Sequence, residues 1–192
     1  IKLRNYLTYN RGELFFAKIW LLVEGETEYI FLDNLLNKDG FLDKKGIRII
    51  QYAHIGAGII LKIARELFMP WFMITDGDTQ GQSNREEALS VLPQSVNLDD
   101  YIYTFTESTI EVYLMNNGFA SIYCSRISPQ NSKKITEPQN SPAYNEAVYQ
   151  AIKNSINKPE IILDIVDNIL TKTFSVPPII EIIREKLEKA GK

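Results

Sequence analysis

The sequence has few of the residues that several classes of protein require. It contains one cysteine, Cys124, and one histidine. An internal disulfide and a zinc site built from several thiolates are therefore excluded. This composition is typical of a reducing compartment, and we expect a cytoplasmic location. No apolar run is long and uninterrupted enough to predict a membrane span, and the amino-terminal residues lack the pattern of a signal peptide.

An excess of positive charge is also missing. The 192 residues include 21 Lys and Arg against 24 Asp and Glu, which gives a formal net charge of −3. A protein that binds DNA through a basic face alone usually has a basic isoelectric point. Binding of an anionic partner by this chain would therefore require positive charge from metal ions. The hydrophobic share of 45% is that of a globular domain, and the length predicts one domain, or one domain with a small appendage.

The first half of the chain alternates between patterns of strand and helix. Short apolar runs predict four strands, at residues 17–23, 47–52, 71–75 and 101–105. Helical spacing follows each run, at residues 27–37, 59–68, 84–91 and 109–115. Repeated strand-helix-strand units predict an α/β fold with a parallel, Rossmann-like sheet flanked by helices.

The second half has a different composition. Residues 125–142 are rich in Ser, Asn, Gln and Pro, which predicts a long surface loop. Residues 143–192 have a helical pattern, with prolines where helices would begin. We therefore expect a linker or the end of a preceding domain at 1–16, an α/β domain at 17–124, the loop at 125–142 and a helical extension at 143–192.

Acidic residues follow the predicted strands. Glu24 ends the first strand, Asp76 and Asp78 end the third, and Glu107 and Glu111 follow the fourth. Because the carboxyl ends of parallel strands meet at one edge of a sheet, these five carboxylates are expected to converge there. Glu28 lies four residues after Glu24 and is expected to face the same side.

Crowded carboxylates repel one another unless cations lie among them, and Mg²⁺ or Mn²⁺ prefers such oxygen ligands. Two such ions would support hydrolysis or transfer at a phosphodiester. A structural interpretation stays open for each motif alone, because an acid after a strand often caps the next helix and Asp-Gly-Asp is a common turn sequence.

Two motifs resemble a known family. Residues 22–28 (LVEGETE), followed about fifty positions later by residues 75–78 (TDGD), resemble the Toprim domain of topoisomerases, bacterial primases and certain nucleases. With Glu28, residues 107–114 (ESTIEVYL) and the helical carboxyl-terminal region, the chain is most similar to the overcoming lysogenization defect (OLD) nucleases, which include the nuclease subunits of Gabija anti-phage systems.

This resemblance implies metal-dependent cleavage of DNA by two-metal hydrolysis, in anti-phage defence or DNA processing. It implies metal ligands at Glu24, Glu28, Asp76, Asp78, Glu107 and Glu111. It implies catalytic roles for Glu24, Asp76, Asp78 and a lysine of the helical region. Lys172, which lies before Pro177-Pro178, resembles that lysine by position, and Lys133 and Lys134 are alternatives.

The resemblance also implies partners. These are DNA, a helicase-like protein and an ABC-type ATPase domain that precedes the Toprim domain in the full-length chain. Further copies of the protein are expected to assemble through the ATPase region, and no membrane partner is expected. Two other functions stay open: a primase-like or RNA-maturing Toprim phosphotransferase, and a non-catalytic regulatory or dimerisation domain.

Overall fold

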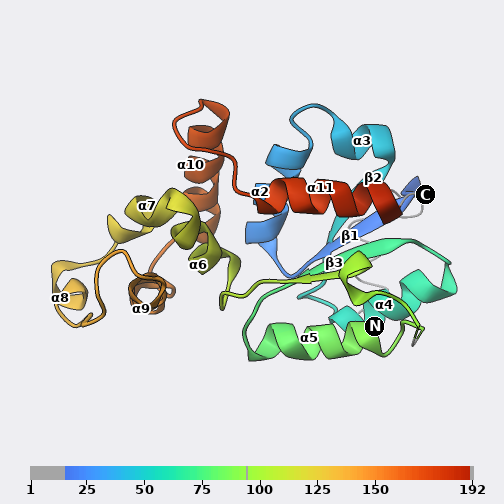
Figure 1. Ribbon diagram of the computed structural model, residues 1–192, viewed down its shortest axis with the longest axis horizontal. Coiled ribbons are helices and arrows are strands. Elements are labelled where there is room, and N and C mark those ends of the chain that lie inside the picture. Colours follow the sequence, from blue (N-terminus) through green and yellow to red (C-terminus); the bar gives the residue numbers. More distant parts are fainter. Residues whose placement is uncertain (1–15, 94, 191–192) are drawn as a thin grey trace.

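The computed structural model describes residues 16–93 and 95–190. Its centre is a four-stranded parallel sheet in the order β2-β1-β3-β4 (Figure 1). The strands are β1 (Ile19–Val23), β2 (Ile47–Gln51), β3 (Trp71–Thr75) and β4 (Ile102–Thr104). The strand order reverses beside β1, because the chain adds β2 on one side of it and β3 on the other. Ligands of open parallel sheets bind at such a reversal, beyond the carboxyl ends of the strands.

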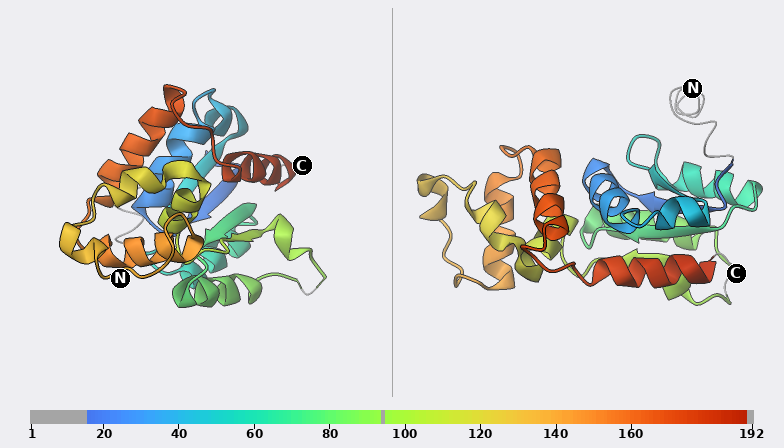
Figure 2. Two further views of the ribbon diagram at one scale, coloured as in Figure 1. Left: turned by 60° about the vertical axis from the view of Figure 1, so that its left-hand side comes forward. Right: turned by 90° about the horizontal axis from the view of Figure 1, so that it is seen from above.

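Helices cover both faces of this sheet (Figure 2). The helices of this part are α2 (Glu26–Leu36), α3 (Phe41–Lys45), α4 (Ala57–Glu66) and α5 (Thr79–Leu89). Alternate strand residues enter two separate apolar clusters: Leu21 packs with α2 and α3, whereas Leu22 packs with α4. Every residue of β1 and β3 is buried, which explains why each strand is an unbroken apolar run in the sequence.

A lobe of helices follows β4. It contains α6 (Ile110–Leu114), a π-helical turn (Met115–Phe119), α7 (Ala120–Cys124), α8 (Pro129–Ser132), α9 (Pro142–Ile152) and α10 (Lys158–Leu170). The segment predicted as a loop therefore includes one short helix, α8, whose first turn is capped by Ser128. The apolar cluster that lies beneath α2 continues into this lobe through α9 and α10.

The last helix, α11 (Ile179–Ala190), leaves the lobe and returns to the sheet (Figure 1). It packs against α2, β1 and β3, with Ile179, Ile183 and Leu187 buried. The predicted α/β fold with a helical carboxyl-terminal part is confirmed. The domain limits stay a prediction, and the segment 1–16 lies outside the described residues except for its last position.

The predicted strands lie within one or two residues of the observed ones, whereas one helix begins earlier than expected. The pattern predicted a start at residue 84, but α5 begins at Thr79. Asp78 caps it, since its Oδ1 accepts a hydrogen bond of 2.8 Å from the Gly81 amide. Within the described part of the chain, none of the helices combines the length and apolar character needed to cross a membrane.

Candidate metal centre at the carboxyl edge of the sheet

Glu28 is the most deeply buried of the acids at the start of α2. Its side chain is 6% exposed, and its Oε2 accepts a hydrogen bond of 3.0 Å from the Gly25 amide. This contact closes the first turn of α2 and fixes the carboxylate below the end of β1. Burial, followed by repulsion from Glu111, raises the pKa of Glu28 to about 7.

Asp76 has a strongly raised pKa. Burial is the largest cause and the charges of Glu28 and Glu24 come next, and together they raise the pKa of Asp76 to about 9. Glu111 and Asp78 add smaller contributions in the same direction. A carboxylate in this environment is ionised at neutral pH only if a cation compensates the surrounding charge.

The turn that carries Asp76 and Asp78 is held by a close backbone contact. The Gly77 amide donates a hydrogen bond of 3.0 Å to the Glu107 carbonyl oxygen, which joins this turn to the one after β4. A Cβ atom at Gly77 would collide with the Glu107 and Phe105 carbonyl oxygens. Glycine is therefore required here, and the Asp-Gly-Asp sequence is more than an ordinary turn.

Glu24 lies at the end of β1 and interacts with several of these groups. Asn84 donates a hydrogen bond of 3.4 Å to its Oε2. Burial, followed by the charge of Asp78, raises the pKa of Glu24, while the charge of Lys158 opposes the shift. Asn84 is 7% exposed and lies on the buried side of α5. We did not predict its role, because an Asn inside a helical pattern gives no local signal of what it contacts.

Glu111 comes to the same edge from α6 and is paired with a lysine of the helical lobe. It is 2% exposed, and its Oε1 lies 2.8 Å from Lys158 Nζ at the first turn of α10. Lys158 also donates a hydrogen bond of 2.7 Å to the Tyr149 hydroxyl. Burial alone would lower the pKa of Lys158, but Glu111 and Tyr149 outweigh it and hold the pKa above its ordinary value.

The structure separates Lys172 from these acids. Lys172 is exposed just beyond the carboxyl end of α10, and it lines a cavity of about 560 Å³ together with Lys38, which follows α2. Lys158 is the first residue of α10 and Lys172 lies two residues beyond its last, so the 13-residue helix separates the two lysines by about 20 Å. The geometry therefore does not support the role that the resemblance implies for Lys172, and Lys158 is the lysine beside the acids.

Three other predicted residues also point elsewhere. Both Glu107 oxygens accept hydrogen bonds, from Thr106 Oγ1 at 2.8 Å and from Asn116 Nδ2 at 3.2 Å. Lys133 and Lys134 are exposed beside α8 in the lobe. The contribution of Glu107 to this edge is thus its carbonyl contact with Gly77, and its role as a metal ligand stays a prediction.

The donor set at this edge consists of carboxylates from separate parts of the chain. In residues 16–93 and 95–190, no three His, Cys, Asp or Glu side chains are placed closely enough to coordinate one ion together. The chemistry nevertheless fits a hard divalent cation, because all the donors are carboxylates and because burial, followed by the charges of neighbouring carboxylates, raises the pKa values of Glu24, Glu28 and Asp76. Binding an ion would require these side chains to converge further.

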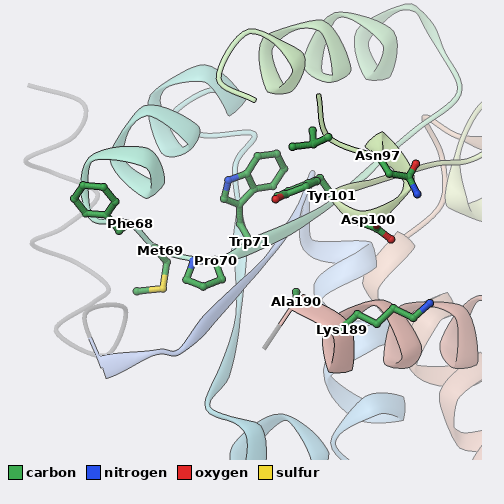
Figure 3. Close-up of a pocket in the computed structure, with 10 residues that line it drawn as sticks. Phe68, Met69, Pro70, Trp71, Asn97, Asp100, Tyr101, Lys189 and Ala190 are labelled. Atoms are coloured by element: carbon green, nitrogen blue, oxygen red, sulfur yellow. The ribbon is translucent and has the colours of Figure 1, made fainter. Parts of the chain in front are cut away.

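A cavity of about 680 Å³ lies at the opposite edge of the sheet (Figure 3). Trp71 and Tyr101 form part of its wall, with ring centroids 5.5 Å apart. Trp71 begins β3, whose other end carries Asp76, so the cavity opens at the amino ends of the strands. None of the predicted site residues lines it.

The parallel sheet and its acidic edge define the chain as a Toprim-type α/β domain. Residues 15–78 match the family model described as overcoming lysogenization defect protein-like, TOPRIM domain. This matched segment is about a third of the 192 residues, and it is similar to the TOPRIM domain of OLD-like proteins.

Similar proteins extend the likeness beyond the matched segment. The carboxyl-terminal region of the Burkholderia pseudomallei OLD protein has a TM-score of 0.68 and 21% identity, over 92% of this chain and all of that one. The equivalent region from Xanthomonas campestris pv. campestris has a TM-score of 0.65 and 18% identity, over 94% and 96%. At these identities the likeness shows a shared fold, which includes the helical lobe.

A curated relative, the uncharacterized protein YbjD of Escherichia coli K12, is 24% identical over 162 residues. The match covers 83% of this chain and 28% of that protein. The chain thus corresponds to less than a third of the length of this relative.

Proposed function

We propose that this chain is the catalytic domain of a metal-dependent DNA endonuclease. The observation that carries the proposal is the convergence of buried carboxylates from separate strand ends. Glu24 and Glu28 follow β1 and Asp76 follows β3, yet the charge of Glu24 raises the pKa of both other acids and the charge of Glu28 raises that of Asp76. Such repulsion destabilises the folded state. Its presence therefore indicates a site that is stabilised when cations bind.

Glu24, Glu28, Asp76 and Asp78 would hold the ions, as Mg²⁺ or Mn²⁺. Bound there, divalent cations supply Lewis-acid stabilisation of a phosphodiester and an activated water. The chain orients its own ligands: Asn84 holds Glu24, the Gly25 amide holds Glu28, and the Gly77 contact fixes the turn that carries both aspartates.

Lys158 would supply the fixed positive charge of this site. Its ammonium is held by Glu111 and Tyr149, and its charge already acts on Glu24. A preorganised cation near a reacting phosphate stabilises the charge that develops in the transition state. Glu111 then acts by holding Lys158 in place, beside any contact of its own with an ion.

The test is the nicking of supercoiled plasmid by the purified protein in Mg²⁺ or Mn²⁺, with chelator as the blank. We expect metal-dependent nicking and a loss of at least about 10³-fold for Asp76→Ala, since the site loses a ligand for the ions that stabilise the transition state. Asp167→Asn, an exposed position on α10, is the matched control. Nicking that survives in Asp76→Ala would contradict the proposal. Cleavage of RNA but not DNA would instead favour an RNA-maturing enzyme.

The partners are part of the same proposal. The curated relative extends well beyond the matched segment, and this supports a TOPRIM domain that works within a longer polypeptide. We propose that an ABC-type ATPase region supplies oligomerisation and control, and that DNA is the substrate. Co-expression with candidate segments, followed by measurement of mass in solution, would test the assembly.

A further inference from the structure

A second feature of the molecule lies along the open edge of the sheet. Among the described strands, β4 pairs with β3 alone, and a groove of about 390 Å³ runs beside its other edge. Its walls come from β4, from Arg85 on α5 and from Lys186 on α11. The two helices lie on opposite faces of the sheet, so the two cations flank the edge strand from both sides.

The backbone of β4 contributes polar groups to this groove. The Tyr101 carbonyl accepts from the Met73 amide, and the Phe105 amide donates to the Thr75 carbonyl, so alternate residues face β3. The amide and carbonyl groups of Ile102 and Thr104 therefore face the groove. A strand of three residues is a poor template for an added peptide strand, whereas backbone amides readily contact phosphate oxygens.

The two cations lie at a similar distance from the acidic edge. Arg85 is seven residues beyond Asp78 on α5, and Lys186 is seven residues beyond Ile179, the first residue of α11. Ile179 is at that edge because its amide donates to Tyr113 Oη, from α6. Seven residues of helix correspond to about 10 Å. At the 3.4 Å spacing of a stacked strand, this distance is about three nucleotides.

The charges favour an anionic occupant near the cations. In the described part of the chain, Arg85 is half-buried and has no ion pair, and Lys186 makes a single contact of 3.4 Å with Asp100. Asp99 lines the end of the groove away from the acids, where it would repel phosphates. A bound segment would therefore be short.

A side-chain contact links the wall of the groove to the strand that carries Asp76. Thr104 lines it, and Thr104 Oγ1 lies 2.8 Å from Thr75 Oγ1. Thr75 is the residue directly before Asp76. A nucleic-acid strand with one phosphate beside Asp76 could therefore extend along β4 and place further phosphates beside Arg85 and Lys186.

We propose that this groove binds a single-stranded segment of nucleic acid that leads to or from the cleavage site, with its phosphates between Arg85 and Lys186. The inference rests on the proposed function and adds the path of the substrate. A cavity of 390 Å³ is large enough for a nucleotide-sized ligand.

The test compares two double variants of the protein in fluorescence anisotropy with a labelled single-stranded oligonucleotide, in Ca²⁺ and at several salt concentrations. R85Q/K186Q removes both groove cations. K62Q/R65Q removes two exposed cations from α4 and leaves the groove intact. Circular dichroism melts show that each variant is folded. We expect about tenfold weaker binding and a salt slope reduced by about 1.4 for R85Q/K186Q, and less than about twofold change for the control.

The outcomes separate the two proposals. If both double variants bind the oligonucleotide equally weakly, the proposed role of the groove is overturned, because the loss then reflects the overall charge of the protein. If the wild type nicks plasmid and R85Q/K186Q binds and nicks as the wild type does, the proposed role of the groove is overturned. The endonuclease proposal is then unaffected. If the folded wild type binds no oligonucleotide at low salt, the proposed role of the groove is overturned, and plasmid nicking decides the endonuclease proposal separately.

Discussion

Helices α2 and α10 pack side by side and run in the same direction, but their two ends differ in chemistry. At the acid end, buried carboxylates gather around Lys158. At the far end, Lys38 and Lys172 are exposed beside the carboxyl termini of the two helices. Cations at helix carboxyl termini are favoured by the helix dipole, so the far-end lysines have a structural explanation. Lys158, at a helix amino terminus, opposes the dipole and needs Glu111 to hold it.

The largest predicted difference between the two ends concerns the lysines. We expect Lys158→Ala to lower the nicking rate by about 10²–10³-fold through lost charge stabilisation, and Lys172→Ala to change it by less than about twofold. Thermal melts of both variants control for folding, and Lys158→Arg should restore part of the activity. If Lys172→Ala were the inactive variant, the assignment implied by the family resemblance would be correct and ours would be wrong.

The second prediction uses the pH dependence of stability. The pKa of Asp76 is raised to about 9, so its native environment favours the protonated form. Its stabilising contribution is complete below the unfolded pKa of about 3.9 and is lost as pH rises towards 9. Metal-free wild type should lose about 2–4 kcal/mol relative to Asp76→Asn over this range, as measured by urea unfolding at several pH values. Mg²⁺ should restore the loss. A difference that does not change with pH would contradict the repulsion we describe.

The third prediction concerns the backbone beneath the acids. Gly77→Ala introduces a Cβ against the Glu107 and Phe105 carbonyl oxygens, and we expect about 1–3 kcal/mol of destabilisation. Gly25→Ala is the matched control at the other acidic turn, because its nearest atom, Glu28 Oε2, is 3.7 Å away. Chemical denaturation measures both. Equal stability of the two variants would show that the turns are not in close contact.

The smallest change in stability is expected at the far end, where the pKa shift has the opposite direction to that of Asp76. Hydrogen bonding to Arg184 lowers the pKa of the exposed Asp39 carboxylate. Its contribution is present above the unfolded pKa and is lost as pH falls. Asp39→Asn should therefore slightly flatten the acid limb of the stability profile and leave the alkaline limb unchanged. A change on the alkaline limb would be inconsistent with this pairing.

The parts of the molecule that could be predicted from sequence depend on local patterns. Unbroken apolar runs located β1 and β3, and the acids after them marked the edge of the sheet. The pairing of Lys158 with Glu111 could not be predicted this way, because the residues are far apart in sequence and meet only when the lobe packs. One signal was available: a lysine directly before Pro159, at a predicted helix start, is in an unfavourable position unless an acid holds it.

The same limitation explains the choice of Lys172. Order along the chain placed it before Pro177-Pro178, but order does not reveal which end of a helix faces the acids. The length of α10 separates the two lysines by about 20 Å, and only the packing of α10 on α2 decides between them.

The return of α11 to the sheet has a mechanical consequence. The chain enters the helical lobe after β4 and leaves it before α11, and both neighbours belong to the sheet (Figure 1). A lobe attached at one point can swing freely, whereas one attached at two points can only rock about the line that joins them. These two attachments, together with the apolar cluster shared by the sheet and the lobe, hold Lys158 in a fixed position relative to the carboxylates of the sheet edge.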